Sequence, residues 1–190
     1  MIAERLGRAA VLAFAVAMLA GAATAQSPTI DPVINPAAIP GATLSLRGPD
    51  GKTASLSAAQ LHDMRRVSVT TLYGAHRTYE GVPLTDLLEL VGGPSDVRLH
   101  LAAFEQMVLV KAPDGFFMPL SIAETSKAWG KGVVIIADQV DGKPLDDKEG
   151  PYRLVFGADA KSHRSVKHVS EIELRRLSID LAAGPEPKAP

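Results

Sequence analysis

The sequence has 190 residues, of which 46% are hydrophobic, and this length suffices for one domain with a substantial core. Its 20 basic and 21 acidic residues give a net charge of −1, so the overall charge offers no argument for nucleic acid as a partner. There is no cysteine, which excludes a thiolate nucleophile, a thiolate metal ligand and a disulfide from the chemistry of this chain.

The first 25 residues have the pattern of a secretory signal peptide. Arg5 and Arg8 provide a basic start, Ala9–Ala20 is an unbroken apolar run, and Ala23-Thr24-Ala25 is a small-residue cleavage site. The apolar run is shorter than the roughly 20 residues that span a bilayer comfortably. The sequence therefore predicts a signal peptide over 1–25, a periplasmic or secreted protein, and no integral membrane segment after cleavage. A retained membrane anchor is the alternative.

Proline-rich segments flank the rest of the chain. Residues 26–42 are predicted to be an extended spacer and residues 181–190 a disordered tail, because both carry prolines at close intervals. These prolines are Pro28, Pro32, Pro36 and Pro40 in the first segment and Pro185, Pro187 and Pro190 in the second. One folded domain is therefore expected over residues 43–180.

The domain is expected to begin with a β-hairpin. Gly48-Pro49-Asp50-Gly51 has the composition of a tight turn and separates two short alternating runs. Ser57 follows as the predicted N-cap of a short helix. Residues Val67–Tyr73 then alternate in the manner of a strand.

The clearest helix is predicted to begin at Pro83, which suits a first turn because its missing N–H would have no partner there. Apolar residues follow at the i, i+3, i+4 and i+7 spacing of one helix face, namely Leu84, Leu87, Leu88 and Val91. Gly92-Gly93 is the expected end of this helix.

The second half is predicted to consist mostly of strands. Val133–Ala137 is apolar on both faces, which is typical of a central strand covered on both sides. A turn is expected over Pro113–Ser121, a short helix over Ile122–Trp129, and Trp129 in the core. The other expected strands are Val97–Ala103, Met107–Ala112, Tyr152–Gly157 and Ser170–Leu177. Strands outnumber the few short helices, which predicts an α+β domain with a mixed β-sheet.

Cationic side chains gather between the last two predicted strands. Arg153 alternates with Tyr152 and Leu154, so it should leave the sheet on the face opposite these two. Arg153 offers paired donors and Lys167 a point charge, and together with Ser165 they could converge on one phosphate group. The alternative is a solvated basic loop.

Other polar residues carry weaker signals. None of the five histidines lies at metal-ligand spacing from another histidine, so no metal site is predicted. Asp146 and Asp147, together with Glu149, are expected to form a solvated acidic loop unless a cation lies there.

Four short motifs occur in order along the domain: Tyr79–Leu84 (YEGVPL), Asp141–Leu145 (DGKPL), Gly150–Val155 (GPYRLV) and Ser165–Lys167 (SVK). This succession resembles the oxidoreductase molybdopterin-binding domain of the sulfite oxidase family, over roughly Leu44 to Leu177. The resemblance implies a mixed α+β fold, a molybdopterin cofactor and redox chemistry on a small oxyanion or sulfoxide. It also implies that Arg153, Ser165 and Lys167 hold the pterin phosphate.

The resemblance further implies a cysteine ligand to molybdenum, at a position that here holds Leu72 or Tyr73. Tyr73, His76 and Arg77 are therefore the candidate catalytic residues at that end of the site, as unusual ligands or as the remains of a lost metal site. Lys148-Glu149 replaces a polar histidine or asparagine of the family, and Glu149 would bring a negative charge near a phosphate.

Several functions remain open on these grounds. The first is an exported molybdopterin-dependent oxidoreductase. The second is a non-catalytic periplasmic module on the same fold, which binds a small anionic ligand or a partner protein. A purely structural envelope domain is the third.

Overall fold

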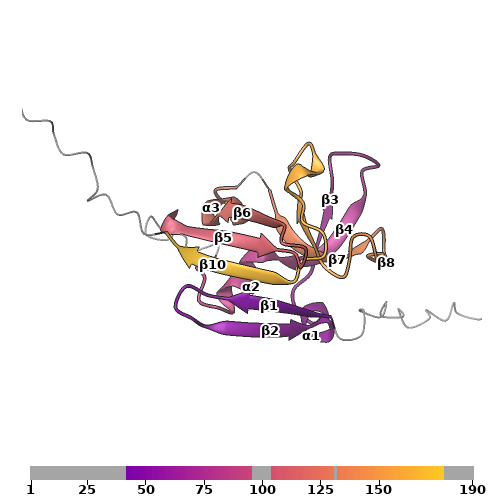
Figure 1. The fold of residues 1–190 in the computed structure, drawn as a ribbon. Helices are drawn as coiled ribbons and strands as arrows, with labels where there is room; N and C mark the ends of the chain where they lie inside the picture. Colours follow the sequence, from indigo (N-terminus) through magenta and orange to yellow (C-terminus); the bar gives the residue numbers. More distant parts are fainter. Residues whose placement is uncertain (1–41, 96–103, 131, 178–190) are drawn as a thin grey trace, which may run out of the picture. The chain divides into compact units, whose positions relative to one another are not determined.

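The computed structural model describes residues 42–95, 104–130 and 132–177, all of which lie in one compact unit, Ile34–Pro190. Two five-stranded sheets and a few short helices make up this part of the chain (Figure 1). The architecture confirms the predicted α+β class. The predicted signal peptide, tail and strand Val97–Ala103 lie outside the described residues, as does the spacer apart from Ala42.

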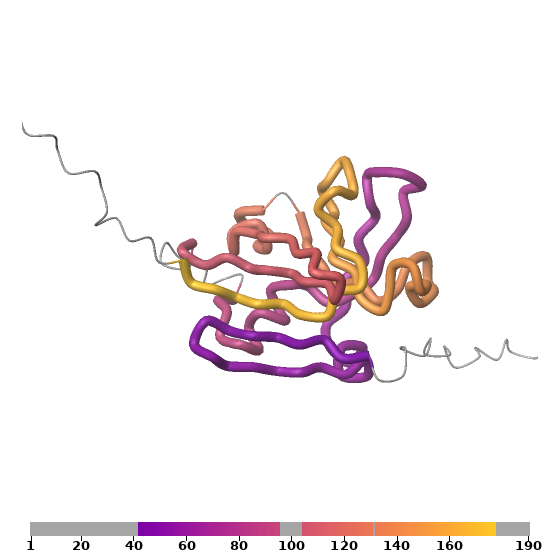
Figure 2. Tube along the Cα trace, viewed as in Figure 1, coloured from indigo at the N-terminus to yellow at the C-terminus, as the bar shows by residue number. Residues whose placement is uncertain are grey.

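The first sheet has the strand order β2-β1-β10-β5-β6. Its strands are β1 (Thr43–Arg47), β2 (Thr53–Ser57), β5 (Gln106–Lys111), β6 (Phe117–Ser121) and β10 (Glu171–Arg176). β1 pairs in parallel with β10, whereas the other neighbours are antiparallel, so the sheet is mixed as predicted. Figure 2 shows the first strands of the domain (indigo) beside the last (yellow).

The second sheet is built around β7 (Val134–Val140), which pairs with β4 along one edge and with β8 and β9 along the other. Its remaining strands are β3 (Val67–Thr70), β4 (Thr78–Pro83), β8 (Lys143–Pro144) and β9 (Arg153–Phe156). Ile135, Ile136 and Ala137 are at most 2% exposed. The predicted central strand, buried on both faces, is therefore confirmed.

The helices are short, and local capping explains where they begin. Ser57 caps α1 (Ala58–His62) and exchanges the two hydrogen bonds of a capping box with Gln60. Ser121 forms the same arrangement at α3 (Ile122–Thr125). The predicted helix after Pro83 is α2 (Leu84–Glu89), and a 3₁₀ turn, η3 (Ser162–Arg164), lies between β9 and β10.

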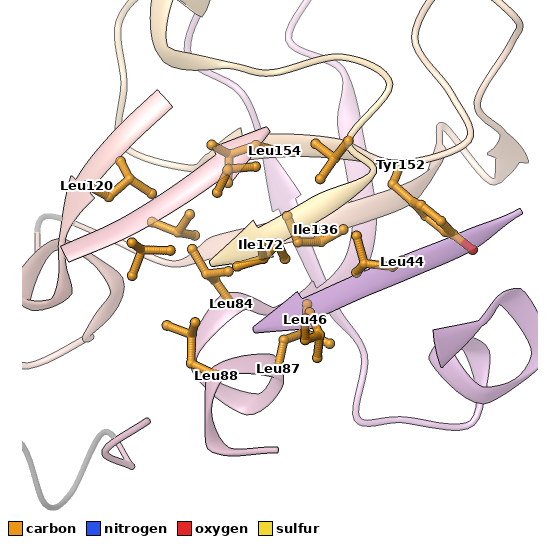
Figure 3. Packing of buried hydrophobic residues seen from close by; sticks show 14 of the residues in the cluster. Leu44, Leu46, Leu84, Leu87, Leu88, Leu120, Ile136, Tyr152, Leu154 and Ile172 are labelled. Carbon is orange, nitrogen blue, oxygen red and sulfur yellow. The ribbon is translucent and has the colours of Figure 1, made fainter. Parts of the chain in front are cut away.

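One large apolar cluster joins both sheets to α2 (Figure 3). Its fully buried members include the predicted α2 stripe, together with residues of β1, β7, β9 and β10: Leu44, Leu46, Leu84, Leu87, Leu88, Ile136, Leu154 and Ile172. A smaller cluster lies on the other face of the second sheet and includes Val69, Tyr79, Ile135 and Val155. The sheet that carries Arg153 is thus packed on both faces.

Close backbone contact between β4 and β7 requires glycine at one position. A Cβ atom on Gly81 would lie 2.0 Å from the carbonyl oxygen of Ile136, at the point where a register shift interrupts the pairing of the two strands. This glycine is the one in the YEGVPL motif, so that motif has a packing role at the base of α2.

Three sequence expectations differ from the structure. The predicted turn Pro113–Ser121 contains an edge strand, β6, and Pro119 is tolerated there because an edge strand need not donate on its open side. β4 was not expected, and the strand runs directly into α2. Trp129 is 62% exposed and contacts Phe104 edge-to-face, so its expected place in the core is wrong.

None of the helices in the described residues is long and apolar enough to span a bilayer.

Candidate functional site

Arg153 stands at the start of β9 and is only 4% exposed. Its neighbours Tyr152 and Leu154 belong to the main core, whereas its guanidinium lies over the ring of Tyr79 in the smaller cluster, 5.1 Å from the ring centroid. The predicted face is therefore confirmed. The side chain points into the packed second face of the sheet and not toward open solvent, so any anion that it binds must also be buried.

Glu149 supplies the anion that Arg153 contacts. One carboxylate oxygen of Glu149 lies 2.6 Å from Nη1 of Arg153, and its side chain is only 14% exposed. The other oxygen accepts a 3.2 Å hydrogen bond from the hydroxyl of Tyr79. The expected solvated acidic loop is thus wrong for Glu149, although its neighbours Asp146 and Asp147 are exposed.

Tyr79 connects the two charged partners. Its hydroxyl accepts a 3.0 Å hydrogen bond from Nη1 of Arg153 and donates to Glu149. Burial raises the pKa of Tyr79 above its ordinary value, against the opposing effect of the nearby Arg153 charge. The phenol therefore keeps its proton near neutral pH, as a donor to a carboxylate must.

Arg77 completes a polar cluster with Tyr79, Glu149 and Arg153, and lies on its more exposed side. Its Nη1 lies 3.3 Å from both carboxylate oxygens of Glu149, and its Nε donates to Asp141 at 3.3 Å. Asp141 is held in turn by the backbone N–H of Thr78. Two guanidinium groups thus share the Glu149 carboxylate, the inner one buried and the outer one partly exposed.

Ser165 and Tyr73 are brought together from distant parts of the chain. The Tyr73 hydroxyl and Ser165 Oγ lie 3.3 Å apart, although 92 positions separate the two residues. The segment after η3 is held along β9 by a 2.8 Å hydrogen bond from the Leu154 N–H to the Val166 carbonyl. The two ends of the predicted site, one near Tyr73 and one near Ser165, therefore adjoin each other.

Lys167 and His76 are exposed, and neither side chain has a hydrogen bond or ion pair within the described residues. Arg153 is buried against Glu149 instead of facing solvent beside Lys167. The expected convergence of Arg153 and Lys167 on one anion is therefore not what this arrangement presents. The role of each residue in holding a phosphate stays a prediction.

Arg164, in η3, also forms ion pairs with acidic side chains of this protein. Asp159 accepts hydrogen bonds of 2.9 and 2.7 Å from it, Glu124 accepts a third, and its guanidinium lies 4.2 Å from the centroid of the Phe156 ring. These residues border a cavity of about 550 Å³ that extends to the exposed Trp129. Arg153 does not line that cavity.

Within the described ranges, no three histidine, aspartate or glutamate side chains are grouped closely enough to hold a metal ion. One buried donor stands out instead. Nε of Arg153 has no hydrogen-bond partner in the described part of the chain, so the donor capacity of this guanidinium is only partly used there.

The sequence patterns did not indicate the importance of Tyr79, and for Glu149 the resemblance indicated only a negative charge near the phosphate position. Glu149 precedes Arg153 by four positions, but the turn between them carries no periodic signal that predicts a contact. Tyr79 lies in the unexpected strand β4. The available signal was its position at the head of the YEGVPL motif.

The family described as "Oxidoreductase molybdopterin binding domain" matches residues 57–179. Among curated protein sequences, none matches this chain. Among solved structures, the sulfane dehydrogenase SoxCD from Paracoccus pantotrophus is similar in fold, with a TM-score of 0.54 and 18% sequence identity. The alignment covers 70% of this chain and 38% of the SoxCD chain, so the likeness spans well under half of that protein.

Proposed function

We propose that this chain, which belongs to the oxidoreductase molybdopterin binding domain family, is a non-catalytic member of that family. It would be an exported module that binds acidic ligands. The observation that carries the proposal is the Glu149 carboxylate, 2.6 Å from the guanidinium of Arg153. The resemblance assigns Arg153 to a pterin phosphate. In this chain the anion at that guanidinium is part of the protein itself.

The residues present do not fit molybdopterin. A phosphate placed against Arg153 would meet the Glu149 carboxylate at close range, and like charges repel strongly where water is largely excluded. At the other end, the thiolate that the resemblance implies has no counterpart, since the sequence contains no cysteine. Leu72 and Tyr73 stand at that position, and neither supplies a thiolate.

The surface next to this cluster offers two exposed lysines for anion binding, Lys161 and Lys167. The exposed imidazoles of His163 and His168 lie in the same short segment, and none of the four side chains forms an ion pair within the described residues. Such a segment attracts anions by local charge even though the whole chain is nearly neutral. A small anion and the acidic surface of a periplasmic protein share this chemistry. The signal-peptide pattern of residues 1–25 supports the periplasm as the place of binding.

Cofactor content tests the non-catalytic assignment. The protein would be purified from cells that synthesise molybdopterin, and bound molybdenum and the fluorescence of oxidised pterin would be measured per chain. We expect both at well under one-tenth of an equivalent. Near-stoichiometric cofactor would overturn the proposal.

Two probes separate the ligand classes: inorganic phosphate for a small anion, and a polyglutamate peptide for an acidic protein surface. Calorimetric titration of the Lys161→Ala/Lys167→Ala variant should show at least fivefold weaker binding than the unaltered protein. Lys52→Ala/Lys143→Ala is the matched control, because it removes two exposed lysines from other parts of the domain. Failure of both probes to bind the unaltered protein would contradict the proposal.

The second candidate is a molybdopterin-dependent oxidoreductase that acts on a small oxyanion or sulfoxide. The contact between Tyr73 and Ser165 favours it, because it brings together the two ends of the site that the resemblance implies. The same cofactor measurement decides between the two candidates.

A further inference from the structure

We propose that Glu149 is a built-in ligand of Arg153 and that its carboxylate occupies a latent oxyanion site. This site would bind phosphate once the Glu149 side chain is removed. This inference rests on the proposed function, because a domain that holds no cofactor phosphate must neutralise the buried Arg153 in another way.

The buried charge of Arg153 needs an anionic partner. Arg153 is 4% exposed, and a guanidinium at that depth destabilises the fold unless an anion lies beside it. Glu149 provides that anion at 2.6 Å. Asp141, the other acid of this cluster, contacts Arg77 and not Arg153. Without Glu149, the cluster would contain two guanidinium groups and one outer carboxylate, and would carry a net positive charge.

Several hydrogen-bond donors surround the Glu149 carboxylate. Nη1 of Arg153, Nη1 of Arg77 and the Tyr79 hydroxyl all point toward its two oxygens. Three converging donors suit an oxyanion such as phosphate, which offers more acceptor positions than a carboxylate does.

Backbone hydrogen bonds hold the main chain of Glu149 in place. The backbone N–H groups of Glu149 and Gly150 bond to the Asp146 carbonyl at 3.1 and 2.8 Å, and the Glu149 carbonyl accepts from the His168 N–H at 3.2 Å. The main chain is therefore held independently of the carboxylate. Shortening the side chain should vacate space without moving the backbone that surrounds it.

The test is anion rescue of stability in Glu149→Ala. We expect this variant to melt at a lower temperature than the unaltered protein. Inorganic phosphate should raise its melting temperature by several degrees more than it raises that of the unaltered protein, because a ligand that binds only the folded state stabilises it. Asp147→Ala is the matched control, since it removes an exposed carboxylate from the same loop, and its phosphate response should equal that of the unaltered protein.

Two further variants keep the inference falsifiable. Glu149→Ala/Arg153→Met removes both partners and should lose the extra response to phosphate. Glu149→Gln keeps the size of the side chain without its charge, and its response should lie between those of the unaltered protein and Glu149→Ala. If Glu149→Ala folds only in the presence of phosphate, the inference is supported. It fails if Glu149→Ala responds no more than Asp147→Ala, if the double variant responds as strongly, or if neither Glu149 variant folds at any phosphate concentration.

This outcome is separable from that of the proposed function. Cofactor bound to the unaltered protein would overturn the non-catalytic assignment, whereas the latent site is judged only by how the variants respond to phosphate.

Discussion

Nη1 of Arg153 donates a 3.0 Å hydrogen bond to the hydroxyl of Tyr79 across the intervening strand β7. The two residues come from strands on opposite sides of β7 and are 74 positions apart in the chain. This contact couples the buried charge to the core of the second sheet. The energetic consequences of that coupling can be measured by substitution.

Arg153→Met should lower the free energy of unfolding by about 3 kcal/mol, because it leaves the Glu149 carboxylate in a largely buried position without its inner partner. The Arg153→Met/Glu149→Gln double variant should lose less than the sum of the two single losses. Urea denaturation of the three variants gives the coupling free energy. Strictly additive losses would show that the two side chains do not stabilise each other.

Tyr79→Phe should cost about 1–2 kcal/mol, since it keeps the ring in the core but leaves a buried donor and a buried acceptor without the shared hydroxyl. Tyr73→Phe is the comparison, because it removes a less buried hydroxyl whose single hydrogen bond within the described residues is to Ser165. Its loss should stay below about 1 kcal/mol. Chemical denaturation at neutral pH distinguishes the two, and equal losses would argue against a connecting role for Tyr79.

Stability should fall in acid through Glu173 on β10. Hydrogen bonds from Arg175 and then Lys111 lower the pKa of Glu173 to about 2, against the opposing effect of its burial. A carboxyl group whose pKa is lowered by folding stabilises the protein above its ordinary pKa, and that contribution is lost as pH falls toward the lowered value. Melting temperatures between pH 6 and pH 2 should therefore decline less steeply in Glu173→Gln than in the unaltered protein. Glu105→Gln, an exposed carboxylate of the same charge, should leave the slope unchanged.

Leu154→Ala should destabilise the domain by about 3 kcal/mol, because Leu154 is fully buried in the cluster that joins both sheets and its removal leaves a cavity. Leu72→Ala removes the same atoms from a side chain that is 58% exposed, so its effect should stay within about 0.5 kcal/mol. Thermal unfolding of the two variants makes the comparison. A large loss from Leu72→Ala would reveal a packing role that its exposure does not indicate.

Much of the fold follows from local patterns. The hairpin turn, the Ser57 cap and the apolar stripe of α2 depend on residues within one or two turns of each other, and the structure confirms each. β6 was missed because its Pro119 indicates a turn unless the strand is known to lie at a sheet edge. Edge position depends on strand order, which no local window contains.

The sequence likewise predicted only some features of the candidate site. Alternation on one strand already predicted that Arg153 faces away from Tyr152 and Leu154, and the sequence alone establishes that no thiolate is available. The sequence could not show that Glu149 is the anion at Arg153, or that Tyr79 connects them. Those contacts depend on how β4, β7 and β9 align and on which polar groups are buried together. Periodicity determines the face on which a side chain lies, whereas burial in the assembled sheet decides which charge must neutralise it.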